Sequence, residues 1–225
     1  MMGAVQRIHY RFGLVLGLIV VAIAFGLASP EGDGARFVSV TLQAAVLVAA
    51  VFASKAHPGV IILAVIAAVA GIVGTAAALI GSGEFGNDSA EIVALLYVLL
   101  TPPAIASGVV KQFQEVRSVT MQTMFGVLCL YLLIGLLFAV AFGAIQAISD
   151  TNFFTTVHGH RDDFLYFSFA TLTTVGYGDL VAATDLGRSL SITEALVGQL
   201  YLVTVVAVIV SNLRPTRARA ASRDD

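Results

Sequence analysis

The chain has 225 residues, of which 58% are hydrophobic and only 12% are charged, and its mean hydropathy is +0.94. A soluble domain of this size could not bury so much apolar surface, so most of it must face lipid or other helices. The net charge of −2 says little about partners, and we expect no nucleic acid among them. The single cysteine, Cys129, excludes an intrachain disulfide. Paired carboxylates, Cys/His clusters and phosphate loops are absent from the sequence, so we expect neither an enzyme nor an organic cofactor.

Six segments are long and apolar enough to cross a hydrocarbon core about 30 Å thick, at about 1.5 Å per helical residue. They predict an all-α membrane protein with spans at residues 12–28, 37–54, 59–80, 91–110, 124–148 and 190–211. The first span could also be a signal peptide, but its apolar stretch is long for that role and we expect a helix. The chain divides into a four-helix membrane domain with a linker (1–123), a second membrane domain (124–213) and a short basic tail (214–225).

The first four spans and the linker carry few distinctive residues. Ala67, Gly71 and Thr75 recur at i, i+4, a spacing that allows close helix packing in lipid. Pro102 and Pro103 predict a kink or a hinge in the fourth span. The polar segment 111–123 has apolar residues at helical spacing and predicts an interfacial helix.

Charge distribution predicts the orientation in the membrane. With both termini in the cytoplasm, most basic residues lie inside, namely Arg7, Arg11, Lys55, Lys111, Arg117, Arg214, Arg217, Arg219 and Arg223. Only Arg36, Arg161 and Arg188 then lie outside. The four arginines of the tail could contact anionic lipid headgroups, or they could serve only to set the topology.

The segment Thr173–Asp179, with the sequence TTVGYGD, fits neither a regular helix nor a strand. Glycine tolerates φ > 0, so Gly176 and Gly178 allow successive peptide units to turn their carbonyls to one side. Upstream, residues 162–172 predict a short buried helix with Asp162 or Asp163 as its N-cap. Downstream, Gly187 and Arg188 lead into the last apolar run.

This helix, loop and helix resembles the pore unit of the potassium channel family, without gaps from about residue 163 to residue 211. The resemblance implies a bacterial six-span channel whose selectivity filter binds potassium ions through Thr174, Val175, Gly176, Tyr177 and Gly178. Thr174 would supply its hydroxyl and carbonyl to the innermost site, and the next three residues would supply carbonyls. The side chains of Val175 and Tyr177 would point away and pack against the pore helix.

The resemblance also implies residues that support the filter. Tyr166 and Phe167 occupy the positions of paired tryptophans in many relatives, and Tyr166 could hydrogen-bond Asp179. Some bacterial relatives carry a buried glutamate at the position of Ala170, and Glu194 could substitute for it.

Other residues would concern gating. Gly198 aligns with the inner-helix glycine proposed as a hinge, or it serves close packing. Gln199, Leu202 and Val206 would line the cavity below the filter. His158 and His160 in the outer loop could sense external protons or be ordinary loop residues.

One filter loop per chain implies a homotetramer in membrane lipid, since four loops form the ring. We therefore expect a potassium-selective channel for passive conduction in the cell membrane. The alternatives are a non-selective cation channel and a non-conducting regulatory or scaffold subunit. The fourth span holds no Lys, Arg or His, so a conventional voltage sensor is not expected. The gating stimulus and the role of the first four helices do not follow from the sequence.

Overall fold

The computed structural model describes residues 12–28, 32–54, 56–80, 97, 100–101, 103–108, 110–111, 121–149 and 151–212. Its helices are α1 (Phe12–Ala28), α2 (Asp33–Ala53), α3 (Pro58–Ile80), α5 (Met121–Ile148), α6 (Arg161–Leu172) and α7 (Asp185–Asn212). The expected spans at 12–28, 37–54, 59–80, 124–148 and 190–211 therefore coincide with helices. The described residues between Tyr97 and Lys111 are also helical.

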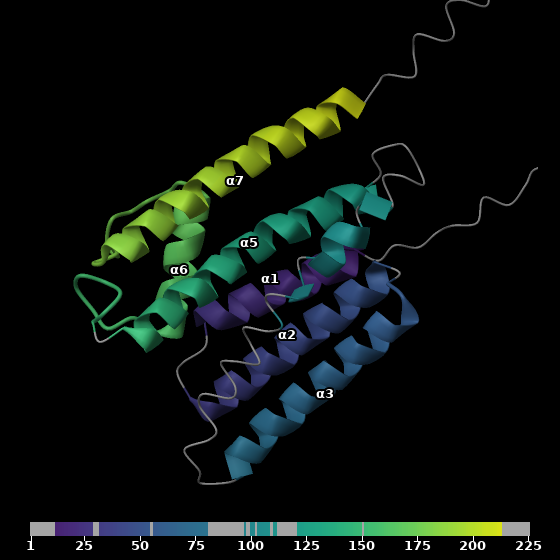
Figure 1. The fold of residues 1–225 in the computed structure, drawn as a ribbon, viewed down its shortest axis with the longest axis horizontal. Coiled ribbons are helices and arrows are strands. Elements are labelled where there is room, and N and C mark those ends of the chain that lie inside the picture. Colours follow the sequence, from purple (N-terminus) through teal and green to yellow (C-terminus); the bar gives the residue numbers. More distant parts are fainter. Residues whose placement is uncertain are drawn as a thin grey trace, which may run out of the picture.

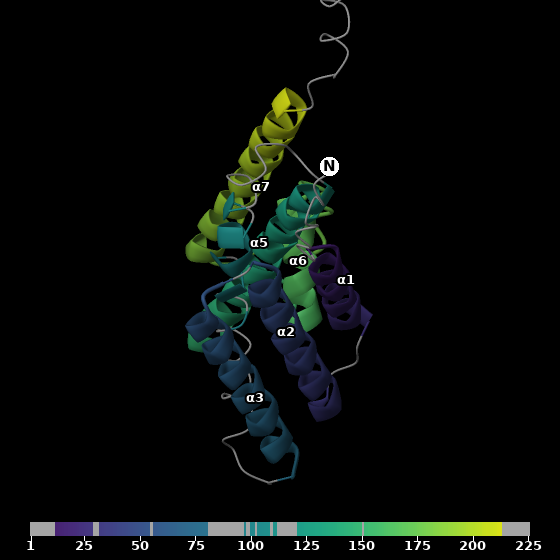
Figure 2. The same cartoon turned by 90° about the vertical axis from the view of Figure 1, so that its right-hand side faces the viewer.

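The long helices lie side by side in one irregular layer (Figure 1). α3 packs on α2, α2 on α1, and α1 on α5, while α7 packs on α5 at the other edge. The short helix α6 contacts α5, α7 and α1, so it is held in the angle between the last two long helices and the N-terminal helix. Figure 2 shows the same order after a quarter turn, with α3 and α7 far apart.

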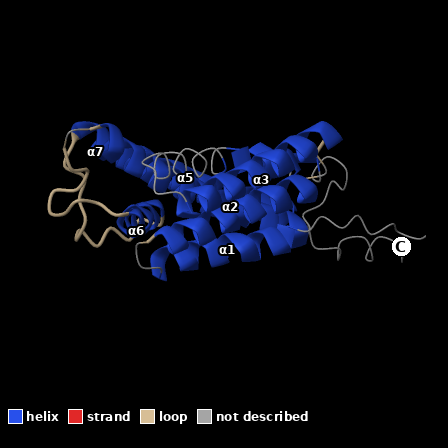
Figure 3. Ribbon diagram, turned by 90° about the horizontal axis from the view of Figure 1, so that it is seen from below, coloured by secondary structure: helices blue, strands red, loops and turns tan. Residues whose placement is uncertain are grey.

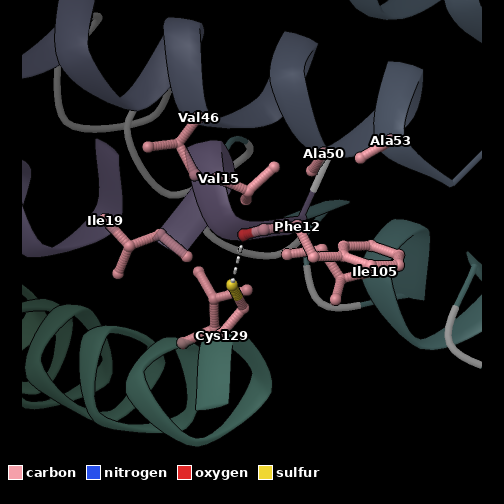
Figure 4. Packing of buried hydrophobic residues seen from close by; sticks show 9 residues of the cluster. Phe12, Val15, Ile19, Val46, Ala50, Ala53, Ile105 and Cys129 are labelled. Atoms are coloured by element: carbon pink, nitrogen blue, oxygen red, sulfur yellow. Dashed lines mark hydrogen bonds between the residues drawn. The ribbon is translucent and has the colours of Figure 1, made fainter. Parts of the chain in front are cut away.

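The contact between α1, α2 and α5 is an apolar cluster without charged groups (Figure 4). Phe12, Val15 and Ile19 of α1 are fully buried there, and Cys129 of α5 donates a weak hydrogen bond from Sγ to the Phe12 carbonyl at 3.7 Å. Cys129 is fully buried and packs here as a small apolar residue. This cluster fixes the N-terminal helices against the C-terminal unit that carries the filter segment.

Apolar side chains also cover much of the outside of the bundle. On α3 the large exposed hydrophobic residues are Val60, Ile62, Leu63, Val65, Ile66, Val69 and Val73. Such a continuous apolar surface indicates contact with lipid or with another protein. By length and composition, residues 58–76 and 121–148 are sufficient to cross a membrane, and α1 and residues 37–53 are shorter apolar helices.

Helix starts differ from those predicted, because the apolar pattern does not mark capping residues. α6 begins at Arg161 with His160 as its N-cap, so the prediction that Asp162 or Asp163 is the N-cap is wrong. Asp163 instead sits in the first turn, where its Oδ2 accepts the His160 N–H at 3.0 Å. α7 begins at Asp185, five residues before the apolar run. There the Thr184 Oγ1 accepts the Gly187 N–H at 3.1 Å, which satisfies one of the free donors of the first turn.

Several expectations fall outside the described residues. These are the interfacial helix beyond Lys111, half of the fourth span including Pro102, the C-terminal arginines, and the basic residues used for the orientation at positions 7, 11, 55 and 117. The described part of the chain begins again at Met121, where the last three residues assigned to the linker, 121–123, already belong to α5.

Candidate functional site: the filter segment and its supports

Residues 173–179, the expected filter segment, leave α6 as a loop at one end of the bundle (Figure 3). Thr174 has φ +58°, Gly176 has φ +54° and Gly178 has φ +82°, whereas Val175 and Tyr177 do not have positive φ. Left-handed residues thus alternate with ordinary ones through five positions. The two glycines adopt the conformation expected of them. A positive φ at Thr174 was not predicted, because a β-branched residue rarely adopts it.

The last turn of α6 holds the inner half of this loop by backbone hydrogen bonds. The Ala170 carbonyl accepts the N–H groups of Val175 at 2.9 Å and Gly176 at 3.2 Å, and the Thr171 carbonyl accepts that of Thr174 at 2.9 Å. The amide nitrogens of residues 174–176 therefore point toward the helix end. Because the donors of this segment are used in this way, its carbonyls are free to face elsewhere.

The outer half of the loop is held by two tyrosines and an aspartate. The Tyr166 hydroxyl of α6 donates to Asp179 Oδ2 at 2.8 Å, which is the contact proposed from the sequence. The Tyr166 and Tyr177 rings are stacked, with centroids 6.3 Å apart and planes at 7°. The Tyr166 hydroxyl holds the pKa of the Asp179 carboxyl below its ordinary value, because the hydrogen bond favours the charged form.

In the single subunit this loop has little cover. Tyr177 is 73% exposed and Val175 is 50% exposed, although both are large apolar or aromatic side chains. Of these two side chains, Tyr177 contacts α6 through its ring, which stacks on Tyr166. The packing of the Val175 side chain against the pore helix, expected from the sequence, is not seen as burial within one chain.

Phe167 contributes to a different cluster from the one expected. Its ring packs against Phe142 of α5 and against Phe153 and Phe154 of the outer loop, at centroid distances of 5.2, 5.9 and 5.3 Å. These rings belong to a buried core beneath the outer loop that also includes Phe164. Phe167 therefore anchors α6 to α5 and the outer loop, and its described ring contacts do not include the filter segment.

The outer loop is tied to the segment that follows the filter. The Thr155 N–H donates to the Val181 carbonyl at 3.0 Å, and the Ala183 N–H donates to the Phe153 carbonyl at 2.8 Å. The Arg188 Nε of α7 donates to the Ala182 carbonyl at 3.1 Å. The chain leaving the filter is thus fixed between the outer loop and the start of α7.

Gln146 organises the outer loop, and sequence reasoning did not single it out. Its Oε1 accepts the N–H groups of Phe153 at 3.3 Å and Gly159 at 3.0 Å, and its Nε2 donates to the Gly159 carbonyl at 2.7 Å. The same Nε2 lies 3.2 Å from His158 Nε2, which must therefore accept, while His158 Nδ1 lies 2.8 Å from Asn152 Oδ1. Proton sensing by His158 or His160 stays a prediction.

On α7, Glu194 is completely buried. Ser168 Oγ is 2.5 Å from Glu194 Oε1 and 2.7 Å from the Gly135 carbonyl of α5. The Tyr131 hydroxyl of α5 donates to the Leu172 carbonyl at 3.2 Å. These contacts join α5, α6 and α7 immediately below the residues that hold the filter segment. Ser168 and Tyr131 are further residues that the sequence pattern did not reveal.

The residues expected to concern the cavity and the gate lie on α7. A Cβ added at Gly198 would lie 2.7 Å from the Leu172 carbonyl oxygen, so this glycine permits close packing against the end of α6. Gln199 Nε2 lies 3.4 Å from Thr174 Oγ1, directly below the filter segment. Leu202 is exposed, and the side chain of Val206 lies outside the described part.

Comparison with known families agrees with this geometry. Residues 127–214 match the family model described as an ion channel, a segment that starts within α5 and ends after α7. No curated protein matches the chain. The family match supports an ion channel of the membrane, and it points to ion transport rather than enzymatic catalysis.

Proposed function

We propose that the protein is a potassium-selective channel that conducts potassium passively across the cell membrane. The observation that carries this proposal is the alternation of positive φ at Thr174, Gly176 and Gly178. In such a segment successive carbonyls can face one line and replace the hydration shell of a cation. Potassium is the transported ion and binds at Thr174, Val175, Gly176, Tyr177 and Gly178.

A homotetramer completes the pore, because one segment per chain supplies one quarter of the ring. The exposure of Val175 and Tyr177 in the single subunit favours this assembly, since neighbouring subunits would cover them. The C-terminal end of α6 points toward the ion path. Its partial negative charge, repeated four times, favours a cation near the membrane centre.

Six spans per subunit surround this pore, with both termini in the cytoplasm and the filter at the outer face. Membrane lipid covers the exposed apolar surface, and the C-terminal arginines are available to anionic headgroups. Tyr166, Asp179 and Glu194 support the filter, and Phe167 supports it indirectly by anchoring α6 to α5 and the outer loop. Gly198, Gln199, Leu202 and Val206 form the wall of the inner cavity. Voltage does not act through a conventional sensor, because the fourth span carries no basic residue.

An ion-flux assay with the purified protein in liposomes tests the function directly. The wild-type protein should carry a potassium flux that the same gradient of sodium does not produce. Gly176→Ala should abolish this flux or its selectivity for potassium, because a φ of +54° is unfavourable for alanine. Gly74→Ala in α3 is the matched control, since an added Cβ there meets nothing. Equal sodium and potassium fluxes would indicate a non-selective channel, and no flux would indicate a scaffold subunit.

A further inference from the structure

Glu194 is a fully buried acid without a counter-ion. The elements packed around it are α5 and α6, and α6 in turn packs on α1. In the described residues of α1, α5, α6 and α7, which carries Glu194 itself, no basic side chain forms an ion pair with Glu194. The other titratable groups of these four helices are Cys129, Tyr131, Arg161, Asp162, Asp163, Tyr166, Asp185, Arg188 and Tyr201. A buried carboxylate without a partner of opposite charge is costly, so its hydrogen bonds must explain why it is tolerated.

Those hydrogen bonds contain more acceptors than protons if Glu194 is ionised. The Ser168 hydroxyl carries one proton, yet its oxygen lies 2.7 Å from the Gly135 carbonyl and 2.5 Å from Glu194 Oε1. The Gly135 carbonyl can only accept. With an ionised Glu194 both neighbours would compete for the one proton, and one oxygen pair would be left in repulsive contact.

A proton on Glu194 removes this conflict. Oε1–H then donates to Ser168 Oγ, and the Ser168 hydroxyl donates to the Gly135 carbonyl, so each contact has its own proton. The distance between Ser168 and Gly135 is ordinary for an O–H···O hydrogen bond, and the distance between Ser168 and Glu194 is short for one. The remaining oxygen, Oε2, is buried and has no hydrogen-bond partner among the residues that the structure describes. As the carbonyl oxygen of a neutral acid it costs less than as part of a carboxylate.

We infer that Glu194 is a positioning residue for the filter and acts as a neutral acid in the chain Glu194–Ser168–Gly135. This inference deepens the proposed function and rests on it. Ser168 lies two residues before Ala170, whose carbonyl holds the N–H groups of Val175 and Gly176. The chain of hydrogen bonds joins α7, α6 and α5 at this point, and so fixes the helix end on which the filter segment is held.

Two substitutions distinguish a neutral donor from a charged acceptor. In Glu194→Gln the amide N–H₂ replaces Oε1–H with nearly the same shape, so all hydrogen-bond directions are kept. In Glu194→Asp the carboxyl group is kept, but the side chain is one methylene shorter and cannot reach Ser168. We expect the Glu194→Gln channel to conduct as the wild type does. In the Glu194→Asp channel, we expect the equilibrium between conducting and non-conducting filters to shift toward the non-conducting state by about five- to thirtyfold. An exposed acid at the start of the same helix provides the control, Asp185→Asn.

Infrared spectroscopy of the purified tetramer at neutral pH detects whether the Glu194 carboxyl group is protonated, and it requires no measurement of ion flux. The wild type and Asp185→Asn should show the carbonyl band of a protonated carboxyl group, and Glu194→Gln should lack it. Absence of the band in the wild type would overturn the neutral acid. A normal current in Glu194→Asp with loss in Glu194→Gln would overturn it as well. A silent wild type that still shows the band would refute the proposed channel while leaving the protonated Glu194 intact.

Discussion

Replacing Gly198 by alanine separates close packing from a hinge. The added Cβ would lie 2.7 Å from the Leu172 carbonyl oxygen and 2.8 Å from Leu172 Cδ1. A backbone oxygen cannot move aside as the end of a flexible side chain can, so α7 or the end of α6 must shift. Overpacking of this kind costs about 1–3 kcal/mol. Against it stands the gain of about 0.5–1 kcal/mol that alanine brings over glycine within a helix.

The control for the helix gain is Gly74→Ala in α3, where the added Cβ meets nothing. Thermal unfolding in detergent should show Gly74→Ala at or above the wild-type midpoint. Gly198→Ala should be less stable than Gly74→Ala by the overpacking cost, about 1–3 kcal/mol per subunit. Because Leu172 lies two residues before Thr174, its shift should also reduce conduction. Equal stability of the two variants, with normal conduction in Gly198→Ala, would refute the packing argument.

Four further predictions concern the filter, the external pH and the response to voltage. Tyr166→Phe should lose current faster during sustained opening, because Asp179 loses the hydroxyl that binds it; unchanged kinetics would show that the contact is without effect. The contact requires an ionised Asp179. Because the pKa of Asp179 is lowered from its ordinary value of 3.8, the contact is lost only when the pH falls below that value. Acidifying the outside to about pH 5 should therefore leave the contact intact in the wild type. Gly176→Ala should keep the tetramer on a sizing column but lose potassium selectivity, and a selective variant would contradict the role of positive φ. Finally, the conductance–voltage curve should be shallow, since each sensor charge contributes about 2.3 kcal/mol per 100 mV and the fourth span has none; a slope of several charges would reveal a missed sensor.

Most of the described helices could be predicted because their signal is simple. An apolar run of about 20 residues predicts a helix whatever it packs against, and α1 agrees with its predicted bounds. The helix starts were less predictable, because a cap is a single contact. Thr184 extends α7 by five residues into a polar stretch, and His160 precedes the acids that composition favours as caps.

The site shows the same division. Gly176 and Gly178 were predictable, since glycine marks a left-handed backbone, and the Tyr166–Asp179 hydrogen bond followed from a resemblance at fixed spacing. The left-handed backbone of Thr174 was not predictable, because β-branched residues disfavour a positive φ. It is explained by the backbone hydrogen bonds from this segment to α6. Ser168 and Gln146 are polar residues that act across helices. Their partners lie 7 to 33 residues away in the chain, and the sequence pattern gives no signal for such contacts.

Reversal potentials in planar bilayers test the central claim most directly. With potassium on one side and sodium on the other, the wild-type current should reverse close to the equilibrium potential for potassium. This result is expected because the carbonyls of residues 174–177 replace the hydration shell of potassium better than that of sodium. A wild-type current that reverses at the same potential after the two cations are exchanged would contradict the assignment of residues 174–178 as a potassium filter.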